Sequence, residues 1–367
     1  MAYTPGDFDD SVIGDVIAKE NLLFATSRIS ELNTSIISGQ AILMHQDPNL
    51  QVLGSGDGIG QRCVSAKMSA IRACDLAVES TLTHSCAVST GAELGDEVVD
   101  MTKSNMVKIQ FSVLDRDCHN AYSFTEKLAY ASMVAKAKME VKLSQLLITR
   151  VNANADTPDA DWFDSTPGTV NGDSYDVIQS DFGADLIADI RAASAITKMN
   201  SPLILSGQNL YNDTFLAQFK GVACCDNDSV LLSNYYQMYF DLHNVDSTVG
   251  ARTTFAIDKN SFFFWSAPDH ATNIFADGSY SIGSPQHMLS DTYIWLDTLP
   301  RLTYMANGSV QPIYIDVRAK RLCEGSSVQS VAYGWAFEYI LRGSLNTNLA
   351  NCDGRKGVLK FTRVEGA

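Results

Sequence analysis

The sequence has few positive charges for its length. Only 27 of its 367 residues are lysine or arginine, against 42 aspartates and glutamates, so the formal net charge at pH 7 is −15. An acidic surface repels phosphate, and the densest basic cluster, Arg318-Ala-Lys320-Arg321, is typical of a solvated strand end. The composition therefore predicts that nucleic acid is a poor direct partner.

Long apolar runs and targeting signals are also lacking. No apolar stretch approaches the ~20 residues needed to cross a bilayer, and the first ten residues are acidic, without the basic and apolar regions of a signal peptide. We therefore expect a soluble protein that is made in a cytoplasm and has no membrane partner. The eight cysteines include no Cys-x-x-Cys pair, and in a chain long enough for a large core we expect them to be reduced and mostly buried.

Motifs that carry chemistry are missing as well. The glycines from Gly54 to Gly60 do not have the offset of a dinucleotide-binding loop, and we interpret them as a flexible hinge. Asp115-Arg-Asp-Cys-His119 lies where a turn is expected, and the adjacent pair Cys224-Cys225 does not suit disulfide geometry. The sequence predicts no catalytic residue, no cofactor-binding residue and no metal site, and it argues against an enzyme.

A long amphipathic helix is the strongest positive signal. Ser123-Phe-Thr-Glu126 has the form of a capping box, and no proline follows before Pro158. Apolar residues then recur every three or four positions, which predicts a helix over residues 124–152 that is roughly 40 Å long. The predicted apolar face consists of Phe124, Leu128, Ala131, Ala135, Met139, Leu143, Leu147 and Val151.

Other segments are predicted from the same patterns. Alternation of apolar and polar residues predicts a half-buried strand over 106–113, and residues 61–84 have helical spacing. A polar loop with a short hairpin is expected between 152 and 180. Further helices are predicted at 12–18, 29–43, 181–198 and 208–220, and strands at 201–206, 230–232, 235–242, 253–257, 261–265, 293–296, 311–317, 331–341 and 357–363.

The order of these parts resembles a known family. The strand before the long helix, the second helix, the segment Asn200-Ser-Pro-Leu-Ile-Leu-Ser-Gly-Gln-Asn-Leu-Tyr211 and the late strand 256–264 are similar in order to the parts of a tailed-bacteriophage major capsid protein of the Hong Kong 97 fold. The resemblance is architectural and spans most of the chain. It implies an α+β fold with an N-terminal arm at 1–60, an extended loop at 61–110, a peripheral domain at 111–184 with a spine helix at 124–152, an axial domain at 185–340, and a returning C-terminal strand at 341–367.

The resemblance also implies a function. Members of this family self-assemble into hexamers and pentamers of an icosahedral phage head that encloses double-stranded DNA. The expected location is the virion, after synthesis in the host cytoplasm, and the expected partners are further copies of the chain, a scaffold protein, a portal, and cement or decoration proteins. We expect the arm at 1–60 to become ordered only on assembly. It is too short for a fused scaffold, and the Lys–Asn crosslinks of some members have no recognisable triad here.

An acidic segment before the strand is a predicted contact with a neighbouring subunit. Glu93, Asp96, Glu97 and Asp100 fall within eight residues without a basic partner among them. An isolated, solvated hairpin would account for them nearly as well. In a shell, this segment would lie over a neighbour, and the basic targets on its long helix would be Lys136, Lys138 and Lys142.

Two other classes of protein stay open at this point. Another virion or shell component would be a tail tube, an encapsulin-like compartment or a double-jelly-roll capsid, although residues 123–220 are too helical for a jelly roll. A two-domain α/β enzyme would need a nucleophile or a cofactor loop, which the sequence does not offer. Closed particles in an electron micrograph would separate these classes.

Overall fold

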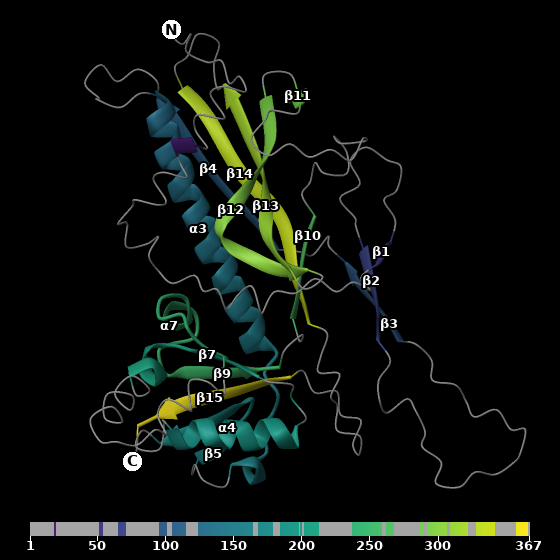
Figure 1. The fold of residues 1–367 in the computed structure, drawn as a ribbon, viewed down its shortest axis with the longest axis vertical. Coiled ribbons are helices and arrows are strands. Elements are labelled where there is room, and N and C mark those ends of the chain that lie inside the picture. Colours follow the sequence, from purple (N-terminus) through teal and green to yellow (C-terminus); the bar gives the residue numbers. More distant parts are fainter. Residues whose placement is uncertain are drawn as a thin grey trace, which may run out of the picture.

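The computed structural model describes residues 18–19, 51–53, 65–70, 95–100, 105–114, 124–163, 168–178, 184–197, 199, 202–212, 237–258, 262–267, 287–289, 292–306, 309–321, 328–341 and 357–365. Within these ranges, one long helix and several short ones accompany three separate sheets. The predicted α+β class is confirmed. Figure 1 shows the long helix alongside a long sheet, with its lower end at a second unit and a small sheet to one side.

The long helix α3 (Phe124–Ala153) has 30 residues, which confirms the helix predicted at 124–152. At 1.5 Å per residue it is about 45 Å long. Ser123 lies outside the described residues, so the predicted capping box is not placed. Because α3 runs along the long sheet and reaches the second unit (Figure 1), it connects the two.

The long sheet lies along α3. Its strands are antiparallel in the order β10-β14-β13-β12-β11, and β4 also pairs with β14. Residues on β4, β12 and β14 contact the helix. The predicted strand at 106–113 is confirmed as β4. The bounds are β4 (Asn105–Leu114), β10 (Phe262–Ala267), β11 (His287–Leu289), β12 (Thr292–Ala306), β13 (Ser309–Arg321) and β14 (Val328–Leu341).

The second sheet forms the core of the second unit. Its order is β5-β6-β15-β9-β7-β8, and β15 is parallel to β6 but antiparallel to β9. The strands are β5 (Gly168–Asn171), β6 (Ser174–Ile178), β7 (Leu203–Ser206), β8 (Gln237–Phe240), β9 (Thr253–Ile257) and β15 (Val358–Val364). The helices beside it are η3 (Ala160–Trp162), α4 (Ala184–Ile196) and α7 (Asn244–Thr248). The predicted hairpin within 152–180 and the helix within 181–198 are thereby confirmed.

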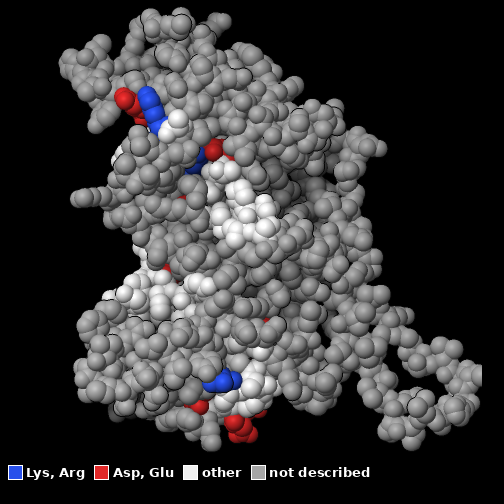
Figure 2. All heavy atoms as spheres, viewed as in Figure 1, with Lys and Arg blue, Asp and Glu red and all other residues white. Residues whose placement is uncertain are grey.

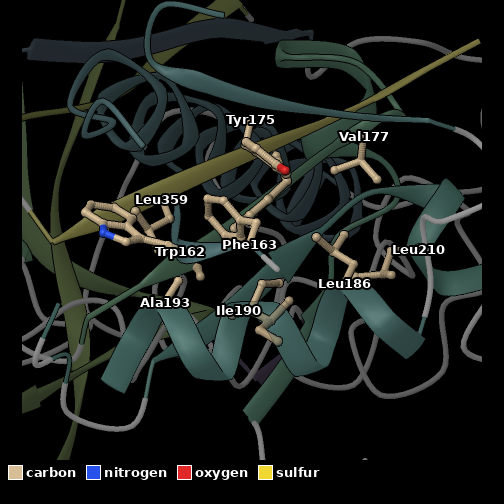
Figure 3. Packing of buried hydrophobic residues seen from close by; sticks show 12 residues of the cluster. Trp162, Phe163, Tyr175, Val177, Leu186, Ile190, Ala193, Leu210 and Leu359 are labelled. Carbon is tan, nitrogen blue, oxygen red and sulfur yellow. The ribbon is translucent and has the colours of Figure 1, made fainter. Parts of the chain in front are cut away.

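An aromatic and aliphatic cluster fills the space between the second sheet and α4. Phe163 stacks on Tyr175 with ring centroids 4.1 Å apart, and Phe361 meets Phe163 edge to face at 5.5 Å. Figure 3 shows Leu186 and Ile190 of α4 pointing toward these rings. The buried positions of α4 follow a helical period, while those of β6 alternate, so each element presents one apolar face to the cluster.

The small sheet consists of β1 (Gln51–Leu53), β2 (Ser65–Ala70) and β3 (Gly95–Asp100), joined in the order β1-β2-β3 with antiparallel pairs. The helical prediction for 61–84 is wrong over residues 65–70. Val64, Met68 and Ile71 have helical spacing, but Ser-Ala-Lys-Met-Ser-Ala also alternates with period two. The pairing with β3 stabilises the strand instead.

Several predictions concern residues that the structure does not describe, and one concerns a domain boundary. Of the predicted arm at 1–60, only residues 18–19, which are helical, and β1 are described, so the rest of the helices at 12–18 and 29–43 lies outside the described residues. The same holds for Asp115–His119, Cys224-Cys225 and most of the helix at 208–220. The strands of the predicted axial range 185–340 belong partly to the long sheet and partly to the second sheet.

Candidate assembly interface

The exposed face of α3 carries two of the predicted lysines. Lys138 and Lys142 are exposed and lie four residues apart, so they are neighbours on one side of the helix. Tyr130 is 51% exposed on the same helix. The acids of α3 are Glu126, in its first turn, and Glu140, which is fully buried. Beyond its first turn, the exposed face of α3 is therefore basic on an otherwise acidic chain.

Lys136 does not belong to this face. It is 3% exposed, and its Nζ atom lies 2.5 Å from Oδ2 of Asp297 on β12, whose side chain is equally buried. The other oxygen of Asp297 accepts a hydrogen bond from the backbone N–H of Thr298 at 2.7 Å. The contact predicted for Lys136 was with a neighbouring subunit, but the structure places this lysine inside its own subunit. Lys136 joins the long helix to the long sheet.

The buried side of α3 is wider than the predicted apolar face. Met133 and Ile148 are fully buried although they lie off the predicted stripe, and Ser132 and Ser144 are buried too. Ser144 satisfies its hydroxyl group by donating to the carbonyl oxygen of Glu140 at 3.0 Å. A single stripe suits a helix with one neighbour, whereas α3 contacts β4, β12, β14 and α7. More of its circumference is therefore covered.

The predicted acidic residues lie mostly in β3. By register, Asp96 pairs with Ser69, Glu97 with Met68 and Asp100 with Ser65 of β2, while Glu93 lies outside the described residues. The strands of the long sheet separate the small sheet from α3 in Figure 1. Within one chain, the structure therefore does not bring these acids to Lys138 and Lys142.

The second unit meets α3 through α7. Nε2 of Gln145 on α3 donates to the hydroxyl oxygen of Ser247 on α7 at 3.4 Å. Just before α7, Asp241 is 1% exposed, and burial raises the pKa of its carboxyl group above the usual value. Hydrogen bonds from the backbone N–H and Nδ2 of Asn244, at 3.0 and 2.8 Å, oppose that shift in pKa. A buried titratable group therefore stands at the N-terminal end of α7, the helix that contacts α3.

A second carboxyl group, that of Asp246 on α7, lies against a glycine. Oδ1 of Asp246 accepts a hydrogen bond from the backbone N–H of Gln208 at 3.1 Å, and burial raises the pKa of Asp246. A Cβ atom on Gly207 would meet this oxygen at a clashing distance and the backbone of Ala251 at 3.2 Å. The close approach of the two segments therefore favours glycine at 207.

The described residues offer no site for other chemistry. Within the part of the chain that the structure describes, no three histidine, cysteine or acidic residues gather in a way that could hold a metal ion. No described helix is both long and apolar enough to cross a bilayer. On the face drawn in Figure 2, the described basic side chains form small, separate groups. This distribution offers no broad described patch for nucleic acid on that face.

Comparisons with known proteins were made with the whole chain. No protein-family model matches it, and no curated protein matches it. Solved structures of phage chains do. A chain of the cyanophage A-1(L) capsid asymmetric unit shares 13% identity at a TM-score of 0.48, over 91% of this chain and 93% of that one.

Two further structures are similar over comparable lengths. The mature capsid of bacteriophage PhiM1 gives 9% identity and a TM-score of 0.44, over 88% of this chain and 93% of that one. A chain from Mycobacterium phage Adephagia gives 14% identity and a TM-score of 0.41, over 93% and 99%. Because these TM-scores lie below 0.5, we base the proposed function on the geometry of the chain itself.

Sequence reasoning missed Asp297. The residue lies in the run Tyr293-Ile-Trp-Leu-Asp-Thr-Leu299, where it is the single charge among mostly apolar residues. An isolated acid in a strand that is otherwise fit for burial indicates a buried charge with a partner. That signal was present, but the pattern around Asp297 does not say that the partner is Lys136.

Proposed function

We propose that the chain is the major capsid protein of a tailed bacteriophage, with a fold of the Hong Kong 97 type. It self-assembles into hexamers and pentamers that build an icosahedral head around double-stranded DNA. Its role is structural, and the proposal assigns it no catalytic, cofactor-binding or metal-binding residue. The protein is made in the host cytoplasm, and its final location is the virion.

One arrangement carries this proposal: a helix of 30 residues that spans two six-stranded sheet units while a small sheet stands to one side. Strands of 3, 6 and 6 residues bury little surface by themselves. A sheet of this size gains stability when another surface covers it, and a symmetric shell supplies a neighbouring copy for every subunit. The rigid helix holds the two larger units at a fixed separation while such contacts form.

The sheets suggest how the domains of this fold are divided. We assign α3 and the long sheet, with the residues that the structure describes between 105 and 163 and between 262 and 341, to the peripheral domain. The second sheet with α4 and α7, with the described residues between 168 and 258 and those at 357–365, forms the axial domain. The small sheet corresponds to the extended loop. This division replaces the continuous axial range 185–340 with one that follows strand pairing.

The proposed contact between subunits joins opposite charges. The acids of the segment from Glu93 to Asp100 in one subunit lie against Lys138 and Lys142 of the next. Lys136 is left out because it is buried with Asp297. Exposed pairs of this kind contribute only ~0.2–1 kcal/mol each, but a closed shell repeats them many times. The other proposed partners are a scaffold protein, a portal and cement or decoration proteins, with DNA in weak, non-specific contact.

Electron microscopy and mass measurement of the purified full-length chain test the function. We expect hexameric and pentameric capsomers or closed icosahedral particles. Open tubes of uniform diameter would favour a tail-tube protein, and closed particles that enclose protein cargo without DNA in infected cells would favour a compartment. A chain that remains monomeric under all assembly conditions would contradict the proposal.

The charged contact has its own test. Replacing Asp96, Glu97 and Asp100 together by lysine is expected to leave the circular dichroism and melting of the subunit unchanged and to block or misdirect assembly. Adding Lys138→Glu and Lys142→Glu is expected to restore shells, because the charges are again opposite. Asp161→Lys, an exposed reversal outside both segments, is the control. Normal shells from the triple variant would disprove this contact without disproving a capsid function.

A further inference from the structure

The strand β15 occupies the interior of the second sheet although it follows every other described strand in the chain. It lies between β6 and β9 in the order β5-β6-β15-β9-β7-β8. Without it, the sheet would divide into the hairpin β5–β6 and the three strands β9, β7 and β8. Each part would expose an unpaired edge, and a two-stranded hairpin is marginally stable at best.

The side chains of β15 complete the core of the same unit. Val358, Leu359 and Phe361 are at most 1% exposed. Phe361 meets the rings of Phe163 and Tyr175 edge to face, with centroids 5.5 and 6.4 Å away. The cluster in Figure 3 is built from segments distant in the sequence, and β15 contributes two of its members. Removing the strand would therefore open the core as well as the sheet.

The start of β15 is also fixed to the residues that follow α3. Oδ2 of Asp156 accepts hydrogen bonds from the backbone N–H groups of Gly357 and Val358, at 2.8 and 3.2 Å. The N–H of Asp156 donates to the carbonyl oxygen of Val358 at 2.7 Å. Gly357 has φ +81°, a left-handed conformation that favours glycine. The end of the long helix therefore positions β15 as it enters the sheet.

The long sheet makes no strand pairing with this segment. Its strands β4 and β10 to β14 end at Leu341, and β15 does not pair with any of them. The two units therefore differ in when their strands become available during synthesis. The long sheet can form once Leu341 has been made, whereas the second sheet must wait for Val364.

We propose that β15 is a completion strand that gates the second unit: this unit folds cooperatively only when residues 357–365 are inserted, while α3 and the long sheet fold without it. Resting on the proposed capsid function, the inference adds that an unfinished or shortened chain cannot enter a shell. A subunit that joined a shell before this step would expose sheet edges to its neighbours. Only chains that contain residues 357–365 would then assemble.

Hydrogen exchange measured by mass spectrometry on the full chain tests this gate. In isolated Phe361→Ala subunits, we expect the amides of β6, β7, β9 and α4 to lose protection together, by roughly tenfold or more. The amides of β12, β13 and the first half of α3 should keep the protection they have in the unaltered protein. Glu365→Ala, just beyond the strand, is the matched control and removes only an exposed ion pair with Arg252. Because exposed pairs contribute little to stability, it should leave the protection of both units almost unchanged.

Two results would overturn the proposal. One is a loss of protection confined to β15, and the other is an equal loss in both units. If Phe361→Ala does not give soluble protein, Phe361→Leu is measured in the same way, with the same ordering expected at a smaller amplitude. Because the measurement uses isolated subunits, it is independent of assembly. Failure of the unaltered chain to form shells would contradict the capsid function and leave the exchange result standing.

Discussion

At the scale of single residues, burial decides which charges are available to other molecules. Lys136 and Lys138 are two positions apart in the sequence, yet one is 3% exposed and paired with Asp297 while the other faces solvent. Desolvating a lysine and a carboxylate costs several kcal/mol per ion, which their mutual attraction has to offset. Such a pair is therefore expected to be sensitive to the loss of one partner.

Replacing Asp297 by alanine is expected to lower the free energy of unfolding by about 3–5 kcal/mol, because it leaves the charge of Lys136 buried without this partner. Urea denaturation of the isolated subunit measures the change. The double variant Lys136→Met with Asp297→Leu removes both charges. Its free energy of unfolding should lie within about 1 kcal/mol of that of the unaltered protein, or be higher. Equal destabilisation by the single and double changes would show that packing, rather than charge, holds this site.

The buried carboxyl group of Asp241 makes stability depend on pH. Burial raises its pKa in the folded state above 3.8, its ordinary value. The folded protein therefore retains this proton to higher pH than the unfolded chain does. From this group alone, the free energy of unfolding falls as the pH rises from about 3.8 through the raised pKa.

Asp241→Asn removes that dependence. The amide of Asn244 can turn so that its oxygen accepts a hydrogen bond from the new side chain, which keeps the local contacts. Relative to the unaltered protein, the variant is therefore expected to gain stability as the pH is raised from 4 to 7. Urea unfolding of both proteins across this range measures the gain. A difference in stability that does not change with pH would contradict a raised pKa at Asp241.

At the scale of elements, α3 is the part on which both larger units depend. It contacts β4, β12 and β14 of the long sheet, and it also contacts α7. Leu143, near its middle, is fully buried. A break at this point would disturb the registration of the helix against both units at once.

Leu143→Pro is expected to prevent folding of the subunit as well as assembly. A proline in the middle of a helix costs ~3 kcal/mol or more, and loss of the buried leucine side chain adds roughly 2–5 kcal/mol. Together these approach the ~5–15 kcal/mol that stabilises a typical protein. Circular dichroism and solubility measure the result, with Leu143→Met, which conserves volume and should cost less than about 1.5 kcal/mol, as the control. A folded, assembling Leu143→Pro protein would mean that the helix is not continuous there.

The elements that could be predicted from the sequence are those with a strong local period. The helix α3, the strand β4, the hairpin β5–β6 and the later strands β9 and β15 lie close to their predicted positions. Local pattern does not contain pairing between distant segments. The register that joins Met106 of β4 to Ala336 of β14 spans more than half of the chain, and no periodicity in either strand indicates it.

The candidate assembly interface shows the same limit, because a local pattern does not reveal contacts between distant segments. That Lys138 and Lys142 share an exposed face follows from helical spacing. The burial of Lys136 does not, because it depends on Asp297 in a strand that packs against the helix from far along the sequence. In the same way, β2 was predicted as helix because its pairing with β3 lies outside the local window.

At the scale of the whole molecule, the two larger units and the small sheet have different requirements for stability. The long sheet and the second sheet each have a buried interior of their own, while the small sheet has three short strands at the side of the molecule in Figure 1. Large compact units joined by a rigid helix suit a repeated building block. A sheet of three short strands gains stability from a contact with the next copy.

A cryo-electron microscopy reconstruction of particles assembled from the purified full-length chain tests this account most directly. We expect a closed icosahedral shell of hexamers and pentamers in which the small sheet of each subunit covers its neighbour, with the segment from Glu93 to Asp100 near Lys138 and Lys142. A protein that stays monomeric under all assembly conditions would contradict the capsid function. A closed shell in which the small sheet contacts only its own subunit would contradict the proposed role of that sheet.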